Sequence, residues 1–186
     1  AEFLTGAAFF LNAGVGAEDG ERLGLGHRWE LRYHFRRACQ ELGHYASAKS
    51  VSALAALLSH EQLGDYARSG LENIKDASAG KALRDALPRL QGRQLAGAIN
   101  SLGVRREAAA VSDLQKLALD AKRGATSEAV SALGLIANVE AAKALQKIVS
   151  EGPADLRVPV AHASLAAAER LRSEEHTSEL QSPCNL

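Results

Sequence analysis

Histidine and cysteine are the residue types of this 186-residue chain best suited to metal binding. Zinc needs three or four converging ligands. The chain has no HExxH motif, no Cys-x-x-Cys motif and no ligand pair at positions i and i+4. We therefore predict no metal site and no cofactor. His44 and His60 fall at expected helix ends, where histidine often meets terminal carbonyl oxygens. The histidines are His27, His34, His44, His60, His162 and His176.

Nucleophilic catalysis has equally little support. Cys39 shares an apolar helical face with Leu42, which favours a buried structural thiol, because no base or oxyanion loop is recognisable nearby. With Cys184 as the second cysteine, a disulfide framework is excluded. No serine stands in a Gly-x-Ser-x-Gly elbow, and "LGLGHRWE" lacks the third glycine and preceding strand of a nucleotide cradle. We predict that the protein is not an enzyme and has no catalytic residues.

The most basic stretch is "HRWELRYHFRR", residues 27–37, in which arginines alternate with aromatic side chains. Such interleaving is typical of nucleic-acid contacts. The alternative is a helix that points Leu31 and Phe35 inward and leaves the arginines as its solvated side. Lys+Arg 22 against Asp+Glu 22 gives a formal net charge of zero. This balance favours the structural interpretation over nucleic-acid binding.

A repeat of about 31 residues runs through the middle of the chain. Three segments align without gaps, starting at Tyr66, Gly97 and Glu128. The register extends upstream to Leu42, and downstream it aligns Leu165 with Leu133 if the spacing slips by one residue. We therefore expect four full repeats and the first helix of a fifth. The shared columns are Ala67, Ala98, Ala129; Leu71, Leu102, Leu133; Ala79, Ala110, Ala141; Leu83, Leu114, Leu145; and Ala86, Leu117, Ile148.

Each repeat predicts two short helices. Apolar residues recur at intervals of three and four, and Gly, Asp, Asn and Ser fill the breaks, as in "LENIKDASAG". Short connections make paired helices antiparallel, and such a pair must stack on its neighbours to bury its apolar face. Alanine and leucine dominate while aromatics make up only 4%, which suits closely packed helices. The predicted fold is all-α, an α-solenoid of stacked antiparallel helix pairs.

The segments "SVSALAALLSHEQLGDYARSGLENI" and "GAINSLGVRREAAAVSDLQKL" resemble bacterial HEAT-like repeat proteins, of the short-repeat kind also found in phycobilisome bilin lyases. The resemblance covers residues 29–171. It implies a HEAT-like array, for which we expect the role of a non-catalytic protein–protein interaction scaffold, as part of a larger protein. Two alternatives stay open: a bilin-lyase-like chaperone for a chromophore, and a nucleic-acid-binding repeat module.

Repeat arrays of this kind bind along the concave face formed by their second helices. The positions expected to point outward there are mixed in sign, with a modest basic bias. "GVRRE" adds two arginines at a turn, where they break the repeat pattern. We expect a protein or peptide partner. The candidate partner-binding residues are Lys81, Arg84, Arg105, Arg106, Lys116, Lys143 and Lys147.

The chain divides into three parts. Residues 1–28 contain "FLTGAAFFLNAGVGA", which could be a signal remnant but lacks a basic leader, so a short helix and a glycine-rich loop are favoured. Residues 29–171 form the repeat domain. Residues 172–186, "RSEEHTSELQSPCNL", resemble one reading frame of a short-read sequencing adapter, so we interpret this tail as non-native and the chain as a fragment. No apolar run is long enough to span a membrane.

Overall fold

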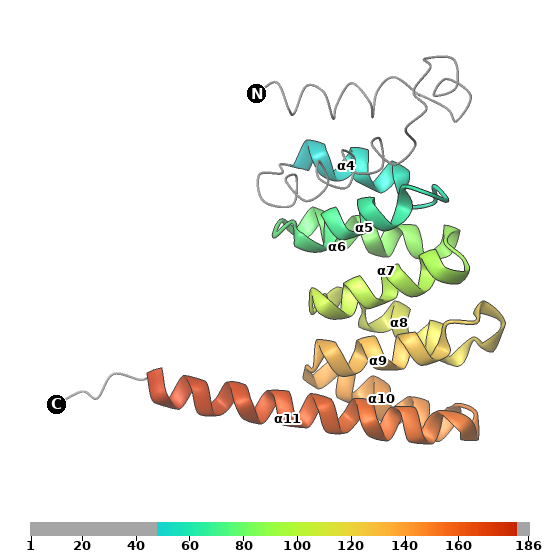
Figure 1. Ribbon diagram of the computed structural model, residues 1–186. Helices are drawn as coiled ribbons and strands as arrows, with labels where there is room; N and C mark the ends of the chain where they lie inside the picture. Colours follow the sequence, from blue (N-terminus) through green and yellow to red (C-terminus); the bar gives the residue numbers. More distant parts are fainter. Residues whose placement is uncertain (1–47, 182–186) are drawn as a thin grey trace, which may run out of the picture. The chain divides into compact units, whose positions relative to one another are not determined.

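The computed structural model describes the backbone of residues 48–181 and the side chains of residues 50–173 (Figure 1). Within these limits every regular element is a helix and no strand occurs, which confirms the predicted all-α class. No helix in the described range is long and apolar enough to cross a membrane. The predictions for the segment 1–28, the basic stretch 27–37 and the side chains His44, Cys39 and Cys184 lie outside the described residues. The same holds for the side chains of His27, His34 and His176.

The chain forms two compact units, divided between Ala86 and Leu87. The first contains α4 (Ala48–Leu57), α5 (Gly64–Asn73) and α6 (Ala77–Ala86). Each of these helices packs against the other two. Leu54, Leu71 and Leu83, one from each helix, are fully buried, as the apolar columns predict for Leu71 and Leu83.

The ring of His60 is hydrogen-bonded within the turn that joins α4 to α5. Its Nδ1 accepts hydrogen bonds from the backbone N–H groups of Gln62 (3.2 Å) and Leu63 (3.3 Å). Its backbone N–H donates to the carbonyl of Leu57, at the end of α4. The predicted place at a helix end is therefore confirmed. The predicted contact of the ring with terminal carbonyl oxygens is not what Nδ1 makes, because an imidazole nitrogen that carries no proton accepts hydrogen bonds, here from two N–H groups of the turn.

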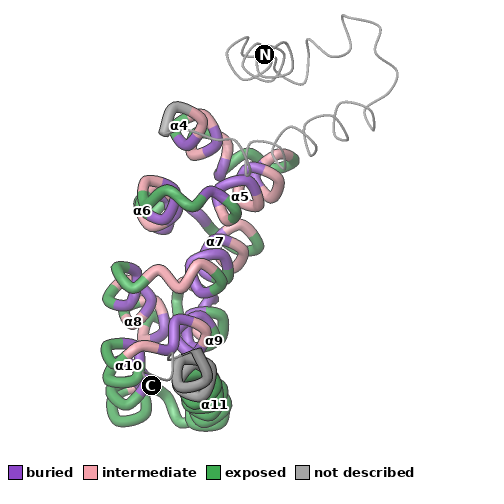
Figure 2. The backbone as a smooth tube through the Cα atoms, turned by 90° about the vertical axis from the view of Figure 1, so that its left-hand side faces the viewer, coloured by how far each residue is buried: buried purple, intermediate pink, exposed green. Residues whose placement is uncertain are grey.

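The second unit holds the longer series of helices. Its α-helices are α7 (Gly92–Val104), α8 (Val111–Leu119), α9 (Thr126–Ile136), α10 (Val139–Glu151) and α11 (Arg157–Gln181). A short 3₁₀ turn comes before each of α7, α8, α9 and α11: η1 (Leu87–Arg89), η2 (Ala108–Ala110), η3 (Ala121–Arg123) and η4 (Ala154–Leu156). In Figure 2, α7, α9 and α11 form one layer of this unit, and α8 and α10 form the other.

Helix α9 lies at the centre of the second unit. It packs against α7 and α11 within its own layer, and against α8 and α10 across the layers. More than half of its residues are buried for this reason: Ala129, Val130, Ala132, Leu133, Gly134 and Ile136. An α-helix buried on this scale needs apolar or small residues around most of its circumference, and "AVSALGLI" supplies them.

Two glycines bring the backbones of α7, α9 and α11 close together; we call these three helices the first layer. A Cβ atom added at Gly103 would lie 2.9 Å from the Cα of Ala132, and one added at Gly134 would lie 2.9 Å from the Cα of Ala163. The two contacts join α7 to α9 and α9 to α11. The two glycines are one sequence period apart, and so are the two alanines, so the period recurs in the packing. The aligned alanine columns missed these positions.

The contact of Ala163 corrects the predicted register of the last repeat. Alignment with Leu133, which is fully buried, predicts a core position for Leu165, but 62% of Leu165 is exposed. Ala163 occupies the place against Gly134, and a residue two positions further along a helix points to the opposite side. Ala163 follows Ala132 by one unchanged period, so the expected slip of one residue is wrong.

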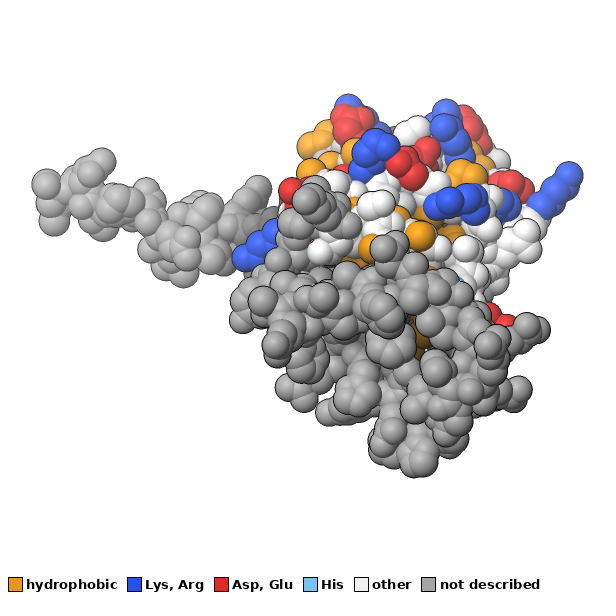
Figure 3. Space-filling model, turned by 90° about the horizontal axis from the view of Figure 1, so that it is seen from above, with side chains coloured by type: hydrophobic (Ala, Val, Ile, Leu, Met, Phe, Trp, Pro, Cys, Tyr) orange, Lys and Arg blue, Asp and Glu red, His pale blue; other side chains and the backbone are white. Residues whose placement is uncertain are grey.

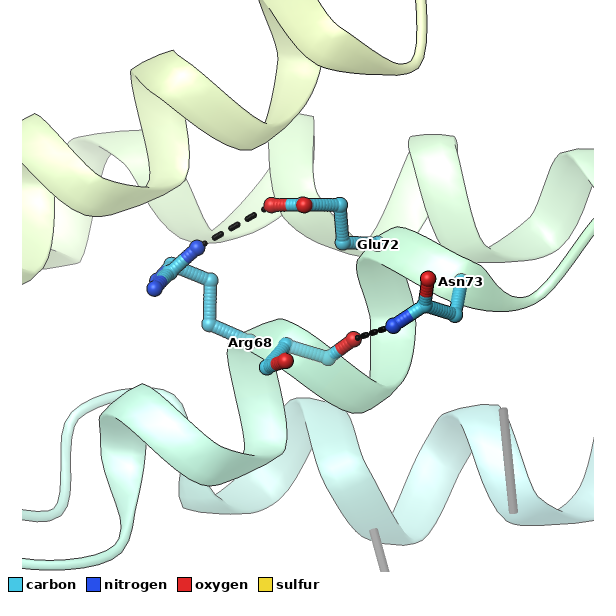
Figure 4. A network of polar contacts seen from close by, with 4 residues as sticks. Arg68, Glu72 and Asn73 are labelled. Atoms are coloured by element: carbon cyan, nitrogen blue, oxygen red, sulfur yellow. Dashed lines mark hydrogen bonds and ion pairs between the residues drawn. The ribbon is translucent and has the colours of Figure 1, made fainter. Parts of the chain in front are cut away.

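In α5, the position one period before Gly103 is occupied by Glu72 rather than by glycine. Its carboxylate forms an ion pair with Arg68 on the same helix, with 3.1 Å between Nη1 and Oε2 (Figure 4). The Nδ2 of Asn73 donates to the carbonyl of Ser69 at 2.8 Å. Helix α5 therefore presents a polar, half-buried side chain at the position where the second unit uses glycines for backbone contact.

Candidate partner-binding surface

The seven candidate residues are divided between the two units. Lys81 and Arg84 lie on α6 of the first unit, and the other five belong to the second unit. Lys116 lies on α8 and Lys143 and Lys147 lie on α10, and these two helices pack against each other. Lys116 and Lys147 are one period apart and occupy equivalent positions. We call the outward surface that carries these three lysines the α8–α10 face.

Every lysine of the α8–α10 face has a carboxylate on its own helix. The nitrogen–oxygen distances are 3.7 Å for Lys116–Asp113, 3.0 Å for Lys143–Glu140 and 3.9 Å for Lys147–Glu151. In the first unit, Lys81 pairs with Asp85 in the same way. The members of each pair stand three or four positions apart, the spacing that places two side chains on one side of a helix. The sequence therefore contained this signal, although the prediction of a basic bias overlooked it.

These pairs make the α8–α10 face neutral. On the part of the surface that is coloured by residue type in Figure 3, acidic and basic side chains lie next to one another. Between 55% and 75% of each of the three lysine side chains is exposed. An exposed pair of this kind contributes about 0.2–0.5 kcal/mol, so a partner can exchange its own charges for either member at little cost. The arrangement suits a partner that carries charges of both signs.

The two arginines at the turn after α7, Arg105 and Arg106, are only partly exposed. The Nε of Arg106 donates a hydrogen bond to the carbonyl oxygen of Ile136 (3.2 Å), at the end of α9. Arg106 itself has φ +52°, and its equivalent Ala137 has φ +50°. This left-handed conformation ends helices well but strains any residue other than glycine. The guanidinium of Arg106 therefore stabilises the contact with α9, and fewer of its N–H groups remain for a partner.

Arg123 is an interaction residue that sequence reasoning missed. Its guanidinium donates to three carbonyl oxygens in the turn before α7: Leu87 at 2.7 Å, Leu90 at 3.1 Å and Pro88 at 3.3 Å. The planar fork of a guanidinium can serve several acceptors at once. No repeat column pointed to it, because the position one period earlier is Gly92. Arg123 fastens the turn before α9 to the turn before α7.

Nothing in the described part of the chain forms a metal site. No group of three or more His, Cys, Asp or Glu side chains is placed to hold an ion among those residues. The largest exposed apolar side chains of the same range lie in the second unit, at the ends of α7 and α10 and along α11: Val104, Val139, Val149, Val158, Leu165 and Leu171.

Searches against protein-family models and curated protein sequences find no match to this chain.

Proposed function

We propose that this chain is a non-catalytic scaffold for protein–protein interaction, in which the α8–α10 face binds a peptide or protein segment. The observation that carries the proposal is the row of exposed, internally paired lysines: Lys116, Lys143 and Lys147. A surface of this kind offers both positive and negative groups to the side chains of a peptide.

The finer architecture belongs to the same proposal. The helix pairs of each unit are HEAT-like repeats of an α-solenoid, with antiparallel helices joined by short turns. The recurrence of the Gly103–Ala132 contact as Gly134–Ala163 supports this architecture, because stacking of equivalent units repeats each contact at the sequence period. In such an array the second helices present a continuous surface, of which the α8–α10 face is one part.

The charge pattern favours a protein partner over nucleic acid. A phosphate backbone is bound by lysines and arginines that replace its counterions. Each lysine of the α8–α10 face is already neutralised by a carboxylate, and Asp113, Glu140 and Glu151 would repel phosphates. A peptide with alternating charges can satisfy both members of each pair.

The test is selection of binders from a displayed library of random peptides on the immobilised full chain. Selected peptides should bind the triple variant Lys116→Glu, Lys143→Glu, Lys147→Glu at least about tenfold more weakly. The matched control is Lys122→Glu, which reverses an exposed lysine in the turn before α9. Peptides that bind the triple variant as well as the original chain would contradict the proposed face. Failure to select any peptide would contradict the scaffold function.

A further inference from the structure

Helix α11 has two apolar faces, of which one is covered. Val160, Ala163 and Ala167 are buried, and α11 packs against α9 and α10. The opposite face carries Val158 and Leu165, which are 65% and 62% exposed, together with the exposed Ala161 and Ala168. We call these four residues the outer face of α11. In Figure 2, green marks exposed residues along the described part of this helix.

The outer face of α11 continues an interface that the fold already uses twice. Counted back by whole periods, Leu165 corresponds to Gly134 on α9 and then to Gly103 on α7. In both of those helices the glycine receives the backbone of the next helix in the layer. The repeat therefore turns this side of α11 towards a further helix, since the equivalent sides of α7 and α9 are covered by one.

Leucine in place of glycine changes what this face can accept. A Cβ atom at Gly134 would already lie 2.9 Å from the Cα, Cβ and carbonyl oxygen of Ala163, so a leucine cannot fit into a contact of that type. A helix on the outer face of α11 must lie further away and leave room for the side chain of Leu165. Interaxial distances of about 8–10 Å, usual for larger side chains, provide that room.

We propose that the outer face of α11 binds the same face of a second copy, with the two helices antiparallel. A twofold axis at Leu165 places this leucine against its counterpart. Each edge of the face then meets the same edge of the other copy, running in the opposite direction. Along one edge, Ala161 of each copy therefore lies near Ala168 of the other. Along the other edge, His162 lies near Glu169 of the second copy, where the imidazole can donate to the carboxylate.

This register explains the composition of the face. Leu165 is flanked by alanines on one edge of the face. On the other edge stand a donor three positions before it, His162, and an acceptor four positions after it, Glu169. The twofold rotation places each of these groups opposite a complementary one. A single helix pair buries an area at the small end of specific interfaces. The dimer is therefore weak and dissociates on dilution.

Sedimentation velocity of the full chain over micromolar to millimolar concentrations tests the dimer. We expect reversible dimerisation, weakened at least about tenfold by Leu165→Glu. The control is Val139→Glu, which changes a similarly exposed valine at the start of α10 and should leave association unchanged. Thermal unfolding of both variants verifies that the exposed substitutions leave the fold intact.

A charge exchange tests the antiparallel register separately. Glu169→Lys should weaken the dimer severalfold, and the double variant His162→Glu, Glu169→Lys should restore it, because the opposite signs are then exchanged between copies. A chain that stays monomeric at every concentration would overturn the proposal. A dimer that persists in Leu165→Glu, or one that the double variant does not restore, would overturn it as well.

Discussion

The two helix layers of the second unit share one sequence period but differ in the side chains that they place at their contacts and on their surface. Between α7, α9 and α11, small residues let backbones touch, at Gly103–Ala132 and Gly134–Ala163. In the layer of α8 and α10, the outward side chains are long and charged, and they pair within their own helix. The first layer therefore tolerates little change in side-chain volume, whereas the surface of the second can change its charges without disturbing the packing.

The strongest test of this difference compares two leucines of the first layer. Leu133→Ala on α9 should lower the free energy of unfolding by about 3–4 kcal/mol, since it leaves a cavity around a fully buried side chain. Leu165→Ala on α11 should cost less than about 0.5 kcal/mol, because this side chain is largely exposed. Urea unfolding measures both. An equal loss of unfolding free energy in the two variants would mean that Leu165 is buried, and it would contradict the corrected register.

The next test adds one methyl group to the first layer. Gly134→Ala should lower the free energy of unfolding by about 2 kcal/mol, because the new Cβ meets the backbone and Cβ of Ala163. The control is Ser131→Ala on the exposed side of α9. It should cause no loss, since alanine has the higher helix propensity and meets no neighbouring helix there. Chemical unfolding measures both variants. A stabilising Gly134→Ala would mean that α9 and α11 do not touch at this point.

A smaller effect is expected where the turns hold the layers in place. Arg123→Ala should cost about 1–2 kcal/mol, since three carbonyl oxygens of the turn before α7 lose a donor. Lys122→Ala removes the adjacent exposed cation and should change stability by less than about 0.5 kcal/mol. Thermal unfolding of the two variants measures the difference. Equal unfolding midpoints would show that the three hydrogen bonds of Arg123 do not stabilise the fold.

The smallest effect is expected on the α8–α10 face. Lys143→Ala should change the free energy of unfolding by about 0.3 kcal/mol or less, because its pair with Glu140 is exposed on both sides. Glu140→Ala should behave alike, and the two changes should be additive within about 0.5 kcal/mol. Double-mutant analysis in urea measures the coupling. A coupling well above that value would make this pair part of the fold and argue against a face that exchanges its charges.

Sequence and structure agree best on features that depend on residues close together in the chain. The all-α class and the buried Leu71, Leu102 and Leu133 were predicted, because helical periodicity and apolar columns depend on residues close together in the chain. The ion pairs of the α8–α10 face were predictable from their spacing. The bonds of Arg123 were not, since its acceptors lie 33 to 36 residues away and occur in no repeat column.

The sequence alone thus determined the helices and their period, because both depend on composition and on spacing along one chain. Only the tertiary structure decided which of two neighbouring positions enters a contact. Ala163, and not Leu165, faces Gly134, since steric fit between two helices sets the rotation of α11 about its axis. That choice leaves Leu165 exposed and creates the surface for which a second copy is proposed.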